Sequence, residues 1–351
     1  MTSGGTERAS SSRPEVIDSY GGIFTLSSLT LTFKYVVDRN GLIYMVLICL
    51  CRPKLLAPIS VSNWMAGLSG NESLADLTLP GTHDSHCTSS NILNWSAVVS
   101  LFAATQSMDI PDQLCAGVRF IDLRCGYDDS GNIQMRHGTV PLKGTLQDAM
   151  NNIASFLSSH KSEVVIASIK WDQSGVNEPT TFGSAVGKVV QTIGSWYTGT
   201  TVPLVRDCRG KIVLFRRYQG DIGLTVEHWL YNKPRFTNNN AQIVVQDQCD
   251  FANAPDRNQC FTTKWGSVKA LLDEAKNAKG NLFINFCSSS SLPWPLITPS
   301  QFANSVNDGL GGYMVSIEGQ RSQRAIKLGI VIQDFPDTKT IQRLILTNFA
   351  S

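Results

Sequence analysis

The chain has 351 residues, of which 42% are hydrophobic and 17% charged, so it can bury a sizeable core. This composition excludes wholesale disorder and collagen-like or coiled-coil architectures. Lys and Arg number 30 against 28 Asp and Glu, and the resulting net charge of +2 argues against a nucleic-acid-binding protein. The function must therefore be sought in local motifs.

Residues 1–60 differ from the rest, and we expect them to form a partly disordered N-terminal extension, for which the sequence indicates no role. Residues 1–20 are rich in Ser, Gly and Thr, which is typical of a flexible lead. The apolar run 42–51 is shorter than the about 20 residues of a membrane span, and it lies too far from Met1 for an ordinary signal peptide. Alternation at 29–33 is consistent with a small strand appendage, and a masked signal-anchor and a wrongly chosen start codon are the other two interpretations.

Residues 61–351 alternate short aliphatic runs with helix-period segments, and we expect one catalytic domain there. Apolar residues recur at helical spacing in 146–157 and again in 268–275. Strands interleaved with helices predict either a parallel (β/α)₈ barrel or a doubly wound open sheet. The predicted strands are 76–79, 118–124, 133–136, 164–170, 211–217, 242–246, 282–286 and 330–333.

Charged side chains follow the ends of most predicted strands. In strand 118–124 the two-residue period puts Asp122 and Arg124 on the same face as Val118 and Phe120. Barrel enzymes assemble their sites at the carboxyl ends of several strands, because the loops there converge on one mouth. One such charge would normally turn to solvent, but the whole set favours a shared polar site. The other members are His83, His137, Lys170, Arg217, Asp247 and Asp334.

Two histidines, basic residues and carboxylates without an obvious metal cluster suit general acid–base catalysis on an anionic substrate, best a phosphodiester. One imidazole can take a proton from an attacking hydroxyl while the other protonates the leaving oxygen, each typically contributing about 10²–10⁴-fold in rate. Arg124 can offer forked donors to the phosphoryl oxygens.

Several motifs follow one another in a characteristic order along residues 63–348. They are LPGTHDS at 79–85, GVRFIDLR at 117–124, RHG at 136–138, SEVVIASIK at 162–170, GKIVLFRRY at 210–218, VQD at 245–247 and VIQDF at 331–335. Together they resemble the X region of phosphatidylinositol-specific phospholipases C of the bacterial, metal-independent type. The resemblance implies an α/β fold, a distorted (β/α)₈ TIM barrel, with phosphodiesterase activity.

The resemblance also implies roles for the catalytic residues. His83 would deprotonate the inositol 2-hydroxyl and be oriented by Asp334, and His137, assisted by Asp84, would protonate the diacylglycerol oxygen. Arg124 would bind the phosphate. The products would be diacylglycerol and inositol 1,2-cyclic phosphate.

Further roles follow for the substrate-binding residues. Asp122 would help to hold the phosphate and the reacting hydroxyl in place, while Lys170, Arg217 and Asp247 would contact the inositol hydroxyls. The resemblance implies no required metal and no other cofactor, because Arg124 stands where calcium-dependent eukaryotic relatives use a metal ion.

The sequence departs from this family pattern at Cys249. The family often has an aromatic residue two positions after the VQD aspartate, which stacks on the inositol ring. Its loss predicts a different polyol head group, a glycosylated inositol, or substitution by a neighbouring aromatic such as Phe251. A further hypothesis is that Cys249 forms a disulfide with Cys260.

Two tryptophans indicate contact with a membrane. Trp95 and Trp294 stand beside Leu or Ile in loops expected on the rim of the site, a composition suited to interfacial insertion, although packing on the barrel is the alternative. We expect a phosphoinositide-like lipid substrate, transient membrane-surface contact, no nucleic acid and a monomeric protein. Glycosylation sequons at Asn71 and Asn94 favour a secreted or membrane-surface location.

Two other functions remain as alternatives. Another barrel phosphodiesterase, such as a glycerophosphodiesterase, would need a metal-binding cluster of carboxylates that the sequence does not offer. A catalytically idle lipid-binding barrel is disfavoured because His83, His137, Arg124 and Asp334 are all intact.

Overall fold

A computed structural model describes residues 19–26, 29–37, 43–50 and 60–350, except 94–95, 227, 239–241 and 323. The chain divides into two compact units, Met1–Pro58 and Ile59–Ser351. The first holds an antiparallel sheet of β1 (Ser19–Leu26), β2 (Leu29–Val37) and β3 (Ile43–Leu50). Strands thus occupy the alternating stretch 29–33 and residues 43–50 of the apolar run.

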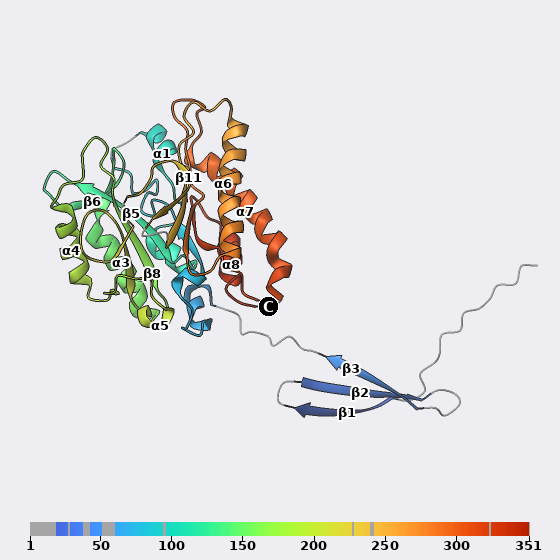
Figure 1. The fold of residues 1–351 in the computed structure, drawn as a ribbon. Helices are drawn as coiled ribbons and strands as arrows, with labels where there is room; N and C mark the ends of the chain where they lie inside the picture. The colour runs from blue at the N-terminus through green and yellow to red at the C-terminus, as the bar shows by residue number, and fades with distance from the viewer. Residues whose placement is uncertain are drawn as a thin grey trace, which may run out of the picture. The chain divides into compact units, whose positions relative to one another are not determined.

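A curled sheet of 11 strands forms the centre of the second unit. Eight strands run parallel in the order β10-β9-β8-β5-β4-β14-β13-β12, and β11 pairs with β12 in the antiparallel direction (Figure 1). Within the described residues no ladder joins β10 to β11, so the sheet curls without hydrogen-bonded closure there. The bounds are β4 Thr78–Thr82, β5 Phe120–Tyr127, β8 Val165–Trp171, β9 Ile212–Arg217, β10 Leu224–Thr225, β11 Lys233–Asn238, β12 Ile243–Asp247, β13 Leu282–Phe286 and β14 Gly329–Gln333.

One predicted barrel strand is wrong. The segment 133–136 belongs to β6 (Ile133–His137), which pairs antiparallel with β5 and with β7 (Val140–Thr145). Only five residues connect β5 to β6, whereas a parallel crossover needs about a dozen or more. The eighth parallel strand is instead β10, whose two residues are too few to produce a strand pattern in the sequence.

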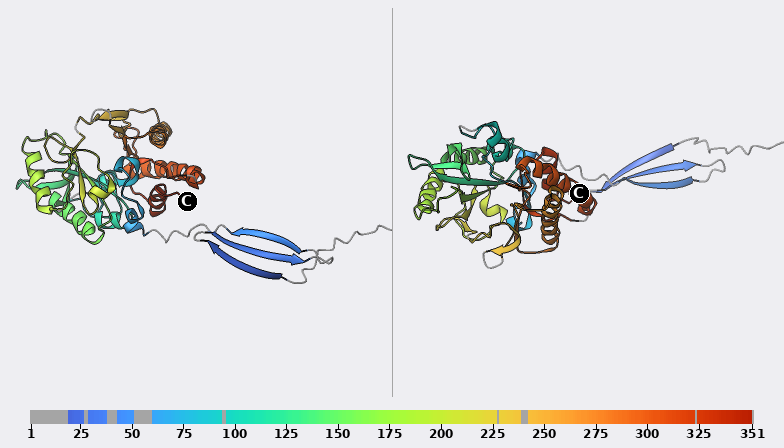
Figure 2. Two further views of the ribbon diagram at one scale, coloured as in Figure 1. Left: turned by 60° about the horizontal axis from the view of Figure 1, so that its bottom comes forward. Right: turned by 90° about the horizontal axis from the view of Figure 1, so that it is seen from above.

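Helices cover the outside of the sheet. In both views of Figure 2 the green helices α3 and α4 lie on a different side of the sheet from the orange-to-red helices α6 and α7. None of the described helices is both long and apolar enough to span a bilayer. The predicted helices are confirmed within α3 and α6. The bounds are α1 Ala97–Ala103, α2 Ile110–Cys115, α3 Leu146–Ser159, α4 Phe182–Ile193, α5 Val205–Cys208, α6 Arg257–Asn277, α7 Pro299–Glu318 and α8 Thr338–Leu346, with short 3₁₀ helices at Val61–Gly67, Leu74–Asp76 and Gly319–Ser322.

Helix α3 shows how the sequence specifies these elements. A reciprocal capping box between Thr145 and Asp148 satisfies backbone donors at its first turn. Its apolar stripe, which includes Met150 and Ile153, is fully buried against the sheet. Burial of that stripe fixes the rotation of the helix about its axis.

A buried ion pair closes the end of the barrel where the parallel strands begin. Arg119, just before β5, donates from Nε and Nη2 to Glu163 Oε2 at 2.9 and 2.7 Å. Its Nη1 donates to the carbonyls of Leu114 and Val118, and Nη2 also reaches the Ser62 carbonyl. Every nitrogen of the Arg119 guanidinium therefore has a hydrogen-bond partner within the protein. Charged groups that can bind a ligand must be sought at the opposite end of the barrel.

Candidate active site

A cavity of about 540 Å³ opens at the carboxyl ends of the parallel strands, where barrel enzymes place their active sites. The structure brings seven of the predicted site residues to its wall, whereas Asp84 and Asp122 are fully buried behind that wall. Trp294 does not line the cavity, and Trp95 lies outside the described residues. The seven residues are His83, Arg124, His137, Lys170, Arg217, Asp247 and Asp334.

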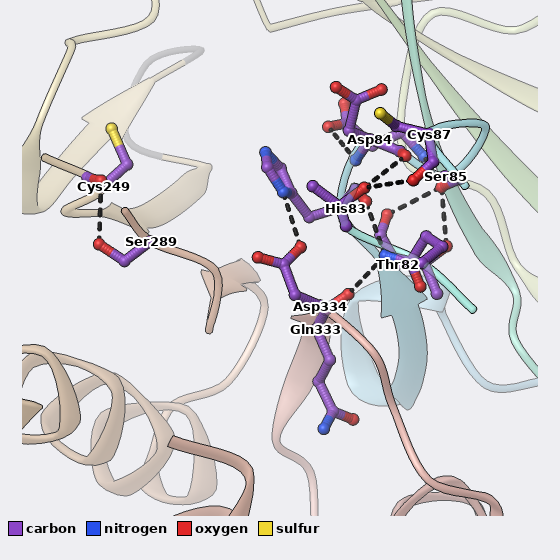
Figure 3. A network of polar contacts seen from close by, with 12 residues as sticks. Thr82, His83, Asp84, Ser85, Cys87, Cys249, Ser289, Gln333 and Asp334 are labelled. Atoms are coloured by element: carbon purple, nitrogen blue, oxygen red, sulfur yellow. Dashed lines mark hydrogen bonds and ion pairs between the residues drawn. The ribbon is translucent and has the colours of Figure 1, made fainter. Parts of the chain in front are cut away.

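His83 and Asp334 form a hydrogen-bonded imidazole–carboxylate pair. They directly follow the neighbouring strands β4 and β14, whose register joins Thr82 to Gln333, and His83 Nδ1 lies 2.8 Å from Asp334 Oδ1 (Figure 3). Burial, together with the positive charge of Arg124, holds the pKa of His83 well below its ordinary value. A neutral imidazole that donates from Nδ1 keeps Nε2 free to accept a proton.

His137 reaches the same cavity from the β6–β7 hairpin. Its Nδ1 lies 2.8 Å from the Ala103 carbonyl oxygen and 3.6 Å from Asp84 Oδ2. The rings of His83 and His137 are nearly perpendicular, at 88°, with their centroids 6.4 Å apart. Burial lowers the pKa of His137 as well. The two imidazoles are thus spaced to flank one small group.

Arg124 is held by a carboxylate and also presents donors to the cavity. Its Nε donates to Asp122 Oδ2 at 3.0 Å, and Asp122 Oδ1 lies 3.4 Å from Arg217 Nη1. Burial alone would raise the pKa of Asp122, but the two guanidinium groups lower it below its usual value. Among the described residues, no protein acceptor lies within hydrogen-bond distance of the two terminal nitrogens of Arg124. These nitrogens can bind an anion bidentately.

Asp172 is a site residue that the sequence analysis missed. It accepts from Lys170 Nζ at 2.5 Å and from the Gly138 amide at 2.9 Å, and it lies 3.8 Å from Arg124 Nη1. Burial opposes its ionisation, but Arg124 and Lys170 hold the pKa of Asp172 far below its usual range. A strand face repeats every two residues, so its position two residues after Lys170 was the available signal.

Another part of the cavity wall, beginning at Arg217, is aromatic and polar. The Arg217 guanidinium carbon lies 3.8 Å from the centroid of the Trp229 ring, a cation–π geometry. Trp229 Nε1 donates to Asp247 Oδ2 at 2.6 Å. Tyr231 lines the same wall, and its hydroxyl donates to Asp250 Oδ2 at 3.1 Å. Trp229 and Tyr231 were also missed, because they follow the two-residue strand β10.

The prediction that Phe251 replaces the absent aromatic is wrong. Phe251 is buried outside the cavity wall and packs against Phe302 with ring centroids 5.5 Å apart. Cys249 does line the cavity, as does Tyr231, so an aromatic ring from a different loop is available at this wall.

The predicted disulfide between Cys249 and Cys260 is also wrong, because both thiols are free. Cys260 is buried in an apolar cluster with Phe302, whereas Cys249 faces the cavity from the segment after β12. Burial, and then the charge of Asp247, raises the pKa of Cys249 to about 11.

A group with metal-ligating potential lies beside His137. Within the part of the chain that the structure describes, Asp84, Cys87 and His137 are the one set of three such residues whose ligand atoms all lie within 4.8 Å of one another. Asp122 and Asp172 are instead paired with protein cations.

The fold and the site together define a class of protein: a parallel α/β barrel whose mouth carries two imidazoles around an arginine-based anion site. Comparisons with known proteins narrow this class. Residues 77–218 match the family model "Phosphatidylinositol-specific phospholipase C, X domain". The resemblance predicted from the motifs is therefore confirmed, and the match to the family model spans residues 77–218.

Relatives resemble the chain well beyond the X domain. A 1-phosphatidylinositol phosphodiesterase of Listeria monocytogenes is 28% identical over 297 residues, which are 83% of this chain and 86% of that protein. The solved phosphatidylinositol-specific phospholipase C from Listeria monocytogenes is similar with a TM-score of 0.67 and 25% identity, covering 83% of this chain and 99% of that one.

A second solved structure, concerned with modulation of the membrane binding of the Staphylococcus aureus phospholipase, has a TM-score of 0.69 and 26% identity. It covers 82% of this chain and 98% of that chain. These neighbours confirm the predicted distorted (β/α)₈ TIM barrel and exclude a doubly wound open sheet.

Proposed function

We propose that the chain cleaves phosphatidylinositol, or a related inositol phospholipid or glycolipid, to diacylglycerol and inositol 1,2-cyclic phosphate. The observation that carries this proposal is the pair of terminal Arg124 nitrogens, which have no hydrogen-bond acceptor among the described residues, in a cavity flanked by His83 and His137. An anion bound there lies between two groups that can each move a proton. The relatives named 1-phosphatidylinositol phosphodiesterase support the same substrate.

The proposed reaction is an intramolecular attack on phosphorus. His83 Nε2 takes the proton of the inositol 2-hydroxyl, and the Nδ1 contact with Asp334 stabilises the imidazolium that forms. His137 donates a proton to the departing diacylglycerol oxygen. Arg124, oriented by Asp122, stabilises the charge on the non-bridging oxygens in the transition state. Asp122 acts through this arginine, because its carboxylate does not reach the cavity.

The inositol ring is proposed to lie against the wall formed by β9, β12 and the loop after β10. Arg217 and Asp247 are aligned there through Trp229, and Lys170 is fixed by Asp172. Cationic and anionic groups on one wall suit a ring of hydroxyls that both donate and accept hydrogen bonds.

Apolar side chains around the cavity mouth support action at a membrane surface. Trp294 is 67% exposed, and Leu292 and Leu296 beside it are also exposed, which argues against packing of this loop on the barrel. Helix α1 also exposes Val98 and Leu101, and the adjoining Phe102 lines the cavity. Exposed Trp and Leu favour the interfacial region of a bilayer. We propose a monomer that contacts the membrane transiently, as a secreted or membrane-surface protein.

Phosphorus NMR of the full-length chain with phosphatidylinositol vesicles in excess EDTA tests the proposal. A cyclic inositol phosphate signal from the wild type, absent with His83→Ala, would support histidine-dependent, metal-independent cleavage. No product would favour the idle lipid-binding barrel. A glycerophosphoryl product, or cleavage only after metal addition, would favour another barrel phosphodiesterase.

A further inference from the structure

A thiol, a carboxylate and an imidazole converge behind the proposed catalytic acid. Residues 84–87 form a tight turn in which the Cys87 amide donates to the Asp84 carbonyl at 2.8 Å. Asp84 has a φ of 40°, a left-handed value that is uncommon for residues other than glycine. Two bonds from Thr105 hold the turn: its hydroxyl donates to the Asp84 carbonyl and its amide to the Cys87 carbonyl, each at 3.0 Å.

The turn places two potential metal ligands on the same side of the loop after β4 (Figure 3). Cys87 Sγ lies 3.7 Å from His137 Nδ1, and Asp84 Oδ2 lies 3.6 Å from the same nitrogen. With bond lengths of about 2.0–2.3 Å, the ligands of a tetrahedral zinc ion are about 3.4–3.6 Å apart. These two spacings therefore already approximate the edges of a zinc tetrahedron.

The Asp84 carboxylate gives an independent indication of a ligand. Asp84 is fully buried, and neither of its carboxylate oxygens has a hydrogen-bond partner in the part of the chain that the structure describes. A buried polar group without partners is unfavourable, so such a group calls for an explanation. By contrast, Asp122 and Asp334 each have a side-chain partner within 3.0 Å.

We propose that Asp84, Cys87 and His137 bind Zn²⁺ and that this ion inhibits the enzyme. Thiolate, imidazole and carboxylate are the ligands zinc prefers, and three protein ligands leave one position for water. On binding, the thiol proton passes to water and His137 binds through Nδ1, so any proton on that nitrogen moves to Nε2 or to water. The contacts of Cys87 and His137 with the Ala103 carbonyl are given up.

Inhibition follows from the chemistry of the imidazole and rests on the proposed function, whereas the metal binding does not. An acid catalyst at this position must be an imidazolium, which carries protons on both nitrogens. A ring bound to zinc through Nδ1 has one N–H left, and a neutral imidazole is a very weak acid. The leaving oxygen would then depart unprotonated, so turnover slows although Arg124 and the inositol wall remain available.

The test uses the full-length protein, freed of metal with EDTA, and two matched thiol variants. Cys87→Ser removes the thiolate with little change in size, and Cys115→Ser removes an exposed free thiol on α2 as the control. Co²⁺, a spectroscopic substitute for zinc, should give tetrahedral ligand-field absorption and a thiolate charge-transfer band in the wild type and in Cys115→Ser. Both features should be lost in Cys87→Ser, and also in Cys87→Ala should the serine variant fold poorly.

The same proteins are then assayed for cleavage with added Zn²⁺. We expect the half-inhibitory zinc concentration to rise at least tenfold in Cys87→Ser and to stay unchanged in Cys115→Ser. A cobalt–thiolate band that persists in both Cys87 variants, or equal zinc inhibition of all proteins, would overturn the proposal. If no protein cleaves the lipid, the proposed function fails, while the cobalt spectra still decide whether the site binds metal.

Discussion

Two arginines five positions apart serve opposite ends of the barrel: Arg119 is fully buried, and Arg124 is buried except at the cavity. Arg119 uses Nε and both terminal nitrogens on Glu163 and on backbone carbonyls, so nothing is left for a ligand. Arg124 uses Nε on Asp122 and keeps its terminal nitrogens at the cavity. Burial of charge alone therefore does not identify a site; the donors that remain unused do.

Replacement of Arg124 should have the largest effect, and that effect should be on activity. Arg124→Met should lower kcat/KM by about 10³-fold, because charge stabilisation of the phosphoryl oxygens is lost. The thermal midpoint should fall only modestly, because Asp122 keeps Arg217 and the Asp84 amide as partners. Arg124→Lys should recover only part of the activity, since lysine lacks the forked donors. Kinetics on vesicles together with thermal unfolding checks this, and a loss below tenfold would contradict the assignment.

The reciprocal change tests stability. Arg119→Met leaves Glu163 buried without its cation, which should cost about 3–5 kcal/mol of unfolding free energy, while kcat of the folded protein stays near the wild-type value. Denaturant unfolding measures the first quantity. Arg119→Met combined with Glu163→Gln should regain part of the stability; an unstable Arg124→Met and a stable Arg119→Met would reverse the comparison.

Trp294, in an exposed loop, separates membrane binding from catalysis in the same way. Trp294→Ala should weaken binding to phosphatidylinositol vesicles by about tenfold, as expected for losing one large apolar side chain from the interface. Cleavage of a soluble inositol phosphodiester should be unchanged. Vesicle sedimentation and the soluble assay form a matched pair, and an equal loss in both would indicate a structural role for the loop.

Tyr231 should have a smaller effect on the head-group side. Tyr231→Ala should raise KM about 2–10-fold with little change in kcat, as expected for one aromatic contact with the ring. Tyr231→Phe keeps the ring and loses only the bond to Asp250, so it should lie close to the wild type. A fall in kcat with unchanged KM would place Tyr231 in the chemistry instead.

The pH dependence of activity should show the smallest effect, and it tests the protonation states of the two histidines at the cavity. His83 must be neutral to act as a base, and its lowered pKa keeps it neutral until the pH falls well below about 6.5. His137 must be protonated to act as an acid, and its lowered pKa means that this form is lost early as pH rises. The optimum of kcat/KM should therefore lie below pH 6.5; an optimum above neutrality would contradict the lowered pKa of at least one of the two histidines, His137 first.

The sequence alone predicted most of the charged residues that line the cavity, but fewer of the residues that hold them in position. His83, Arg124, Lys170 and Asp334 come at or just after regular strands, where chain order and the two-residue period suffice. His137 was predicted at the end of the segment 133–136 and again from the RHG motif, but that segment was misread as a barrel strand because alternation does not reveal strand direction.

The missed parts of the site depend on contacts between distant segments. Trp229 and Tyr231 follow a two-residue strand without periodicity, and Asp172 gains its meaning only beside Arg124 and the Gly138 amide. The Asp84 carboxylate, which lacks a hydrogen-bond partner among the described residues, lies in a turn held by Thr105, a contact that the sequence does not reveal.

The central claim is that His83 and His137 divide the two proton transfers, and an activated leaving group tests it most directly. A nitrophenyl inositol phosphate releases an oxygen that needs no protonation, so His137→Ala should cleave it nearly as well as the wild type while failing on phosphatidylinositol. His83→Ala should lose about 10²–10⁴-fold on both substrates. Equal losses for the two variants on the activated substrate would contradict the division of roles.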